Sequence, residues 1–203
     1  VGGPNLTPEQ ATLSERCVGM ALGSWFGSGI SSARYSAREK VESKEVDESK
    51  LITCNLFLRR AALEQTGLFN PNQYPCDENE LLQRMKGKGY RLLYVPSLGV
   101  QHKRRQMFFP FARQIYWYGI GRGVLVRRAP ECFKPIHMMP SLFVIWLVSG
   151  VATPFHLALR TVYIFGLLSY SALLLVASSQ VVLQEEGSIL SIPIVMSAIL
   201  LIH

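Results

Sequence analysis

Cysteine is scarce in this chain. The 203 residues include four, which stand far apart at Cys17, Cys54, Cys76 and Cys132. No two of them form a Cys-x-x-Cys pair, the spacing that many zinc sites require, so the sequence argues against a zinc site. Irregularly spaced cysteines are typical of reduced thiols, and we expect them in a cytoplasmic domain.

Charge is almost absent from the last third of the chain. Between Met138 and Leu183, Arg160 is the one formally charged residue. A membrane-spanning helix needs ~20 apolar residues, and this run is about twice as long. Arg at mid-membrane costs ~2.5–3.5 kcal/mol, so we place Arg160 at an interface between two spans, 139–158 and 161–183. A buried helical core of a large soluble protein is the alternative, and it fits such a long charge-poor run less well.

A third apolar segment, 188–203, follows a polar turn and predicts a further span that the chain end truncates. Because the sequence begins at Val1 and ends inside this apolar run, we expect it to be a fragment. The composition then divides the chain into a first domain at 1–130, with an interfacial segment at 106–130, and a membrane domain at 131–203.

Basic residues outnumber acidic ones, with a net charge of +7 and a pI near 9.4. Such an excess suits nucleic acid, an anionic membrane face or a phosphorylated substrate. The basic residues precede the apolar segment directly, which marks the cytoplasmic side of a membrane and makes nucleic acid an improbable partner. They are His102, Lys103, Arg104, Arg105, Arg113, Arg122, Arg127, Arg128 and Lys134. We therefore predict an integral membrane protein whose first domain faces the cytoplasm.

The first domain reads as alternating helices and strands. Apolar residues at helical spacing predict a helix over 12–25, with Leu13, Cys17, Met20, Ala21 and Trp25 on its buried face. A Gly-rich stretch at 23–40 predicts a mobile loop, and 40–50 predicts a solvated charged segment. Residues 51–58 predict a strand, 59–66 a helix ended by Gly67, and 90–102 a strand interrupted at Pro96.

Three acidic residues, Asp77, Glu78 and Glu80, stand together at the start of a predicted helix. Asp77 can cap this helix, whose apolar face is Leu81, Leu82 and Met85 and which Gly87 or Gly89 would close. Capping explains Asp77 without requiring the other two carboxylates. The spacing alone does not decide between a reaction site and a capped helix start.

The motifs occur in the order of a known family. "VGGP", "CNLFLRRAALEQTGLFN", "DENELLQRMKGKGY" and "VQH" follow one another over residues 1–130. Together they resemble the carboxy-terminal part of a membrane-attached family 2 glycosyltransferase of the succinoglycan or exopolysaccharide type. The resemblance implies an α/β fold: a partial GT-A, nucleotide-diphospho-sugar transferase-like domain followed by transmembrane α-helices.

The resemblance also implies site residues. The second acid of the family's "ED" motif deprotonates the acceptor hydroxyl and corresponds to Glu78, with Asp77 as the competing choice because the pair is inverted here. Asn55 falls in the family's substrate-binding stretch. Glu80 and Arg84, one helical turn apart, are expected to pair and to support the substrate site.

His102 matches a histidine that helps hold a divalent metal, Mg or Mn, in many GT-A enzymes; a surface histidine at a strand end is the alternative. The family's Asp-x-Asp motif, which binds the metal and the nucleotide-sugar donor, does not occur in these 203 residues. We expect the remaining metal ligands upstream of residue 1, and we expect the fragment alone to be inactive.

The segment "RQIYWYGIGRG" lies where processive synthases carry Gln-x-x-Arg-Trp. Gln114 is one place too close to Trp117, and Tyr116 replaces the arginine, which favours a single-addition enzyme. Arg113 and Arg122 either contact the phosphates of a lipid-diphosphate acceptor or neutralise lipid headgroups.

The expected function is that of an inverting hexosyltransferase. It would move a hexose from a nucleotide-sugar to a lipid-linked glycan at the cytoplasmic membrane face, in polysaccharide biosynthesis. A glycolipid-forming transferase and a non-catalytic membrane scaffold derived from the same fold are the alternatives.

Overall fold

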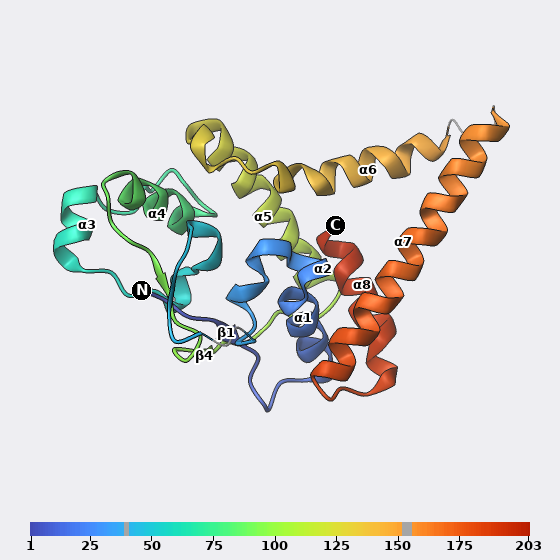
Figure 1. Ribbon diagram of the computed structural model, residues 1–203, viewed down its shortest axis with the longest axis horizontal. Coiled ribbons are helices and arrows are strands. Elements are labelled where there is room, and N and C mark those ends of the chain that lie inside the picture. Colours follow the sequence, from blue (N-terminus) through green and yellow to red (C-terminus); the bar gives the residue numbers. More distant parts are fainter. Residues whose placement is uncertain (39–40, 152–155) are drawn as a thin grey trace.

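The computed structural model describes residues 1–38, 41–151 and 156–203, and the chain is mostly helical (Figure 1). The described residues contain four strands, each of two residues: β1 (Asn5–Leu6), β2 (Lys44–Glu45), β3 (Leu93–Tyr94) and β4 (Val100–Gln101). β1 pairs with β4 in parallel, and β2 pairs with β3 in antiparallel orientation. Parallel pairing fits an α/β layer, but the complete GT-A arrangement stays a prediction.

Helix α1 (Leu13–Gly23) begins at a capping box formed by Thr12 and Glu15. The Thr12 hydroxyl accepts from the Glu15 amide, and the Glu15 carboxylate accepts from the Thr12 amide at 2.9 Å. Cys17 is buried on the predicted face, as are Met20 and Ala21. The prediction is wrong at both ends of this face, where Leu13 and Trp25 are exposed.

The Gly-rich stretch is helical in the part that follows α1, so the predicted mobile loop is wrong there. Ser24 caps α2 (Trp25–Ser28) by accepting from the Gly27 amide, and the 3-10 helix η1 (Gly29–Arg34) follows at once. Burial of Ala33 and Arg34 at the end of η1 anchors the segment. Residues 39 and 40 of the predicted loop lie outside the described residues.

The charged stretch and the predicted strand after it also differ. Glu48 and Ser49 in η2 (Glu48–Lys50) are buried, contrary to the solvated segment expected there. Instead of a strand over 51–58, the chain forms the 3-10 helix η3 (Thr53–Asn55), with one isolated bridge from Leu56 to Gly2. The apolar run buries Leu51 in the core, but it does not pair with a neighbouring strand over its length.

Helices α3 (Arg60–Thr66) and α4 (Asp77–Gly87) frame the acidic motif. Leu81, Leu82 and Met85 of α4 are buried with Tyr94 of β3 in one apolar cluster, as the periodicity predicts. Asp77 is the first helical residue and Cys76 occupies the N-cap, so the prediction that Asp77 caps α4 is wrong.

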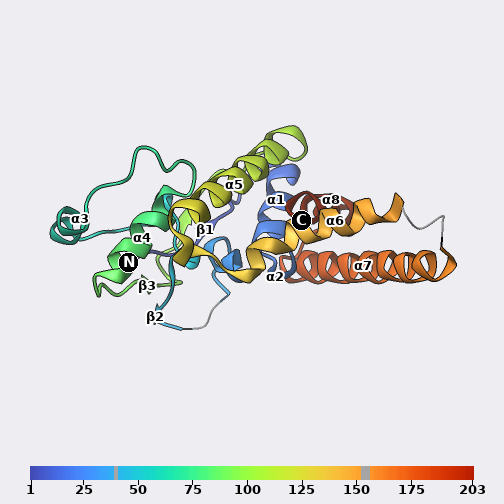
Figure 2. The ribbon, with the colours of Figure 1, turned by 90° about the horizontal axis from the view of Figure 1, so that it is seen from above.

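After β4 the described residues form helices joined by short 3-10 turns. The helices are α5 (Phe109–Arg128), α6 (Met139–Ser149), α7 (Leu157–Gln184) and α8 (Ile192–Ile202), and the 3-10 turns are η4 (Pro130–Cys132), η5 (Pro135–Met138) and η7 (Ile189–Ser191). Figure 2 shows α6 and α7 side by side, extending away from the domain. The rings of Phe143 and Tyr170 lie 4.7 Å apart, and those of Trp146 and Tyr163 lie 5.3 Å apart. These contacts make α6 and α7 antiparallel neighbours.

Helix α7 is long and apolar enough to cross a membrane, and it contains the predicted span 161–183. Only 11% of its apolar window is buried, which argues against the core helix of a soluble protein. The other predicted spans are shorter as helices: α6 covers part of 139–158, of which 152–155 lie outside the described residues, and α8 has 11 residues.

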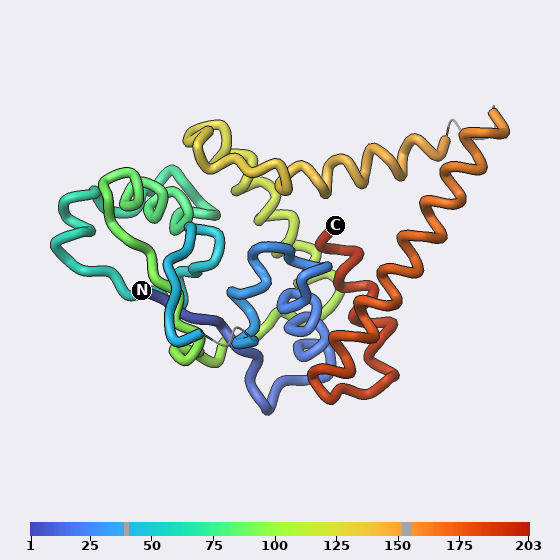
Figure 3. The backbone as a smooth tube through the Cα atoms, viewed as in Figure 1, coloured from blue at the N-terminus to red at the C-terminus, as the bar shows by residue number. Residues whose placement is uncertain are grey.

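The largest apolar cluster joins both ends of the chain. Buried side chains of α1, α5, α7 and α8 form it, including Val18, Phe111, Val182 and Ile199. The tube in Figure 3 shows α8 beside α1 and α2, with the C-terminus close to them. The apolar segment predicted as a third span therefore packs against the first helix of the chain.

Candidate active site

The turn before α4 lies in close contact with helix α5. Tyr74–Pro75 is a cis peptide bond, and Cys76 has a positive φ of 75°, a left-handed conformation that few non-glycine residues adopt. Helix α5 crosses this turn at Gly121, where a side chain would lie 2.6 Å from the Pro75 carbonyl oxygen. Glycine at 121 therefore lets α5 pack closely against Pro75, two residues before Asp77.

Gly121→Ala should destabilise the protein by about 1–3 kcal/mol, because the added methyl group overlaps backbone atoms that cannot rotate away. A methyl group at Gly123, on the same helix, would meet no atom within 4 Å, so Gly123→Ala should be neutral or stabilise by about 0.5–1 kcal/mol. Denaturant unfolding in detergent micelles measures both. Equal effects of the two substitutions would contradict this packing.

Glu78 is the buried carboxylate of the motif. Its Oε1 lies 3.5 Å from Nη1 of Arg34, and its side chain keeps 11% of its surface exposed. A charged pair so little exposed to water is screened weakly, so Arg34 stabilises and orients the carboxylate.

Two phenols lie within reach of the Glu78 charge. Burial raises the pKa of Tyr35 and of Tyr118, and the Glu78 carboxylate raises both further. Gln114 donates from Nε2 to the Tyr118 hydroxyl at 2.8 Å, so α5 carries a pair of neutral hydrogen-bonding groups. Such phenols can hydrogen-bond a hydroxyl-rich ligand without carrying charge.

Asp77 and Arg122 complete the polar surroundings. Asp77 is half-buried beside Glu78. Arg122 of α5 is half-buried too, and its Nη1 is enclosed without a hydrogen-bond partner among the described residues. Burial raises the pKa of the Cys76 thiol, while the Arg122 guanidinium opposes that shift, which places the cation near the acidic motif. The structure thus places Asp77 and Glu78 next to each other at the start of α4, and the close approach of Gly121 to Pro75 brings the α5 turn that carries Arg122 near them. Gln114 lies earlier on α5, where it bonds Tyr118.

Glu80 and Arg84 form the predicted pair, bonded at 2.6 and 2.9 Å. Arg84 also donates to the carbonyl oxygens of Thr66 at 2.8 Å and Leu68 at 2.9 Å, at the end of α3. All these donors are engaged within the protein, so this pair fastens α3 to α4. Its predicted contribution to substrate binding stays a prediction.

Asn55 and His102 lie on the strand side of the domain. Asn55 is buried and donates to the carbonyl oxygens of Pro4 at 3.1 Å and Leu98 at 2.6 Å. His102 is exposed at the end of β4, and partial desolvation together with Arg104 lowers its pKa, which favours the neutral imidazole. Within 1–38, 41–151 and 156–203, no three His, Cys, Asp or Glu side chains group as a metal site.

The donors of the described residues therefore do not fit a divalent metal on their own. His102 as a metal ligand stays a prediction. Arg104, which the sequence placed in the membrane-facing basic run, is instead buried with its guanidinium 5.1 Å from the Tyr35 ring. Arg104 is held there by hydrogen bonds to the β1 segment, including one from its Nε to the Thr7 hydroxyl at 3.2 Å.

The outer face of α5 carries the predicted interfacial residues. Arg113 is exposed, and Trp117 is exposed with its ring in edge contact with Tyr116. Phe109 at the start of α5 is also exposed. Aromatic and basic side chains on one exposed surface are typical of a helix at a membrane interface.

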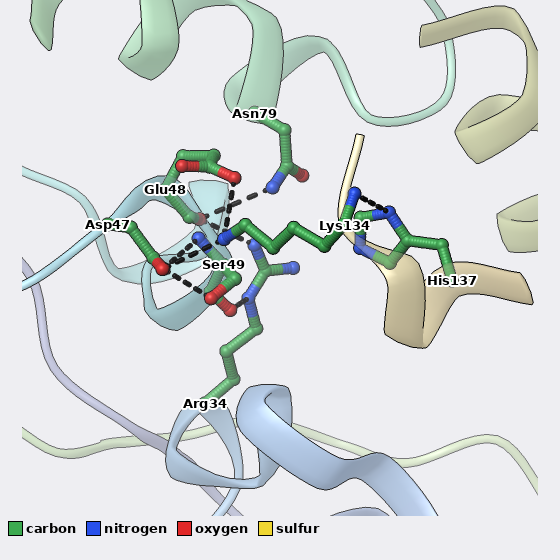
Figure 4. A network of polar contacts seen from close by, with 7 residues as sticks. All are labelled: Arg34, Asp47, Glu48, Ser49, Asn79, Lys134 and His137. Atoms are coloured by element: carbon green, nitrogen blue, oxygen red, sulfur yellow. Dashed lines mark hydrogen bonds and ion pairs between the residues drawn. The ribbon is translucent and has the colours of Figure 1, made fainter. Parts of the chain in front are cut away.

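A buried ionic network, which sequence patterns did not single out, lies beside the motif (Figure 4). Lys134, between η4 and η5, bonds Asp47 at 2.8 Å and Glu48 at 2.9 Å. Asn79 of α4 donates to the Glu48 carbonyl oxygen at 3.3 Å. The adjacent Asp47 and Glu48 were the one sign of this network in the sequence. The charged residues around them indicated a solvated segment instead.

His137 belongs to the same network, and its surroundings predict that the stability of the protein depends on pH. Its Nδ1 accepts from the Lys134 amide at 3.2 Å. Burial, then the Arg122 and Lys134 charges, lower its pKa from 6.5 to about 4. The unfolded chain therefore binds a proton between about pH 6.5 and 4 that the folded chain does not, so stability falls as pH drops through this window.

His137→Gln should remove this loss, which is about 1 kcal/mol once the shift is discounted for a half-buried ring. The apparent Tm in detergent, followed from pH 7 to pH 4 for both proteins, measures it. A wild-type Tm that falls no more steeply than that of His137→Gln would refute the assignment.

Comparisons with known proteins identify no relative. The chain matches no family model, no curated protein and no solved structure.

Proposed function

We propose that the chain is the acceptor-side part of an inverting, membrane-attached hexosyltransferase. The observation that carries this proposal is the Glu78 carboxylate. It is held by Arg34 at 3.5 Å, keeps a small exposed surface, and lies beside Asp77 at the start of α4. The family resemblance of the motifs supports the same assignment.

In the proposed reaction Glu78 is the general base. The acceptor hydroxyl transfers its proton to the carboxylate as its oxygen forms a bond to the anomeric carbon. The bond between that carbon and the diphosphate oxygen breaks on the opposite face, and the nucleoside diphosphate leaves with the electron pair. Configuration inverts because attack and departure are in line.

The phenols of Tyr35 and Tyr118 would hydrogen-bond the sugar hydroxyls, and Arg122 would face a phosphate of a lipid-linked acceptor. Arg113 and Trp117 would hold α5 at the headgroup level, and α7 would anchor the protein in the membrane. The donor diphosphate and its metal require carboxylates that an Asp-x-Asp motif supplies, and we propose that they lie beyond these 203 residues.

The experiment uses membranes from cells that produce the full-length protein, because the donor site is proposed to lie beyond these 203 residues. Labelled UDP- and GDP-hexoses are supplied with Mn²⁺ or Mg²⁺, and transfer to lipid-extractable product is followed. The proposal expects transfer from at least one donor, with inverted anomeric configuration. Label in an oligosaccharide-lipid supports the glycan acceptor, and label in a simple glycolipid supports the alternative acceptor. Absence of donor binding by any sugar-nucleotide would favour a scaffold and overturn the proposal.

A further inference from the structure

The guanidinium of Arg34 is held in one orientation by the backbone of η2. Its Nε donates to the Ser49 carbonyl oxygen at 2.6 Å, and its Nη2 donates to the Glu48 carbonyl oxygen at 2.9 Å. These two acceptors leave Nη1 to face Glu78. The side chain of Arg34 is 8% exposed, so this direction is fixed by protein groups rather than by water.

Two carboxylates stand beside the backbone that Arg34 holds. Lys134 Nζ lies 2.8 Å from Asp47 Oδ2 and 2.9 Å from Glu48 Oε1, and the Glu48 side chain is 3% exposed. A buried carboxylate without a cation is strongly unfavourable and attracts the nearest positive group. Lys134 supplies that cation (Figure 4), which leaves the third nitrogen of Arg34, Nη1, to Glu78.

Lys134 stands directly before the apolar helices of the chain. It lies between η4 and η5, in the segment 130–138 that leads from α5 into the apolar helix α6. Asn79, next to Glu78 on α4, donates to the same Glu48 carbonyl oxygen that Arg34 binds. Continuous contacts thus run from the segment before α6, through η2, to the first turn of α4.

We propose that Lys134 and Arg34 are positioning residues for Glu78. Lys134 neutralises Asp47 and Glu48, so that Arg34 remains paired with Glu78. The position of segment 130–138 is therefore coupled to the geometry of the Glu78 carboxylate. This proposal rests on the proposed function for its catalytic consequence. Its electrostatic core, a competition between Glu48 and Glu78 for one guanidinium, is independent of the activity.

The competition distinguishes this coupling from a general loss of structure. Lys134→Met leaves Glu48 charged and unpaired, so Glu48 draws Arg34 away from Glu78. Adding Glu48→Gln removes the competitor, and Arg34 returns to Glu78. The second substitution therefore repairs the first, whereas two independent structural losses would add.

The test compares Lys134→Met, Glu48→Gln and the double variant in native membranes. Lys103→Met is the matched control, because Lys103 also pairs with a buried carboxylate, Glu15, at 3.8 Å, but is itself 85% exposed. Two quantities are measured: kcat and KM of hexosyl transfer, and hydrogen–deuterium exchange of backbone amides over 74–82, which needs no activity.

Lys134→Met should lower kcat by roughly ten- to hundred-fold with KM nearly unchanged, and should speed exchange over 74–82. The double variant should regain kcat to within about threefold of wild type and restore slow exchange. Lys103→Met should leave both quantities unchanged. A double variant as impaired as Lys134→Met, or a single variant with wild-type exchange, would overturn the coupling. If the wild type transfers no hexose, the proposed function fails, and the exchange comparison still decides the competition between Glu48 and Glu78.

Discussion

Glu78→Gln should lower kcat of hexosyl transfer by about 10²–10⁴-fold, because a general base contributes an effect of that size and the amide cannot accept the proton. Gln has nearly the same volume, so the fold should be kept. The donor affinity should change little, since the substitution leaves the proposed donor site intact. Initial rates at saturating donor, in membranes, measure the loss.

Asp77→Asn is the matched control, one residue away on the same helix turn. It should retain most of the turnover if Glu78 is the base. The reverse pattern, with Asp77→Asn inactive and Glu78→Gln active, would keep the hexosyltransferase but transfer the role of base to Asp77. Similar modest losses in both variants would argue that neither carboxylate removes the proton.

Phe111→Ala should have the largest effect on stability, a loss of about 3–5 kcal/mol, because it empties a ring-sized volume in a packed core. Phe111 is fully buried where α5 meets α1, α7 and α8. Since no polar group is exposed by the change, the cost arises from the cavity and the lost apolar contact. Denaturant midpoints in detergent micelles measure the difference.

Phe109→Ala, two residues earlier on α5, removes the same ring from a position that is 77% exposed. It should shift the free energy of unfolding by no more than about 0.5 kcal/mol. Equal losses at 109 and 111 would mean that the ring at 111 does not hold the four helices together.

Helical periodicity predicted the helices of this chain well where one face is buried. The apolar face of α4 and most of that of α1 are as expected, because side chains three and four residues apart share a face. Of the two glycines predicted to close α4, Gly89 does so: the Tyr90 amide donates to the Met85 carbonyl oxygen, and Gly89 has a positive φ, whereas Gly87 is the last residue of the helix. These are local properties that neighbouring residues determine.

Long-range contacts explain what the patterns missed. Arg34 lies within a Gly-rich stretch whose composition predicts a loop, and it is buried because carbonyl oxygens of η2 and the distant Glu78 accept from it. Lys134 is separated from Asp47 by 87 residues. Charge runs indicate solvated faces when no partner is known, and the sequence does not reveal which basic residue will pair with which carboxylate.

The packing of α8 against α1 sets a condition on synthesis of the protein. Cys17 and the Ser191 carbonyl are in contact although 174 residues separate them. A ribosome adds about 5–20 residues per second, so α1 waits on the order of ten seconds or more before α8 emerges. During that interval the apolar face of α1 lacks its final cover, and chaperones or the insertion machinery must shield it from neighbouring nascent chains.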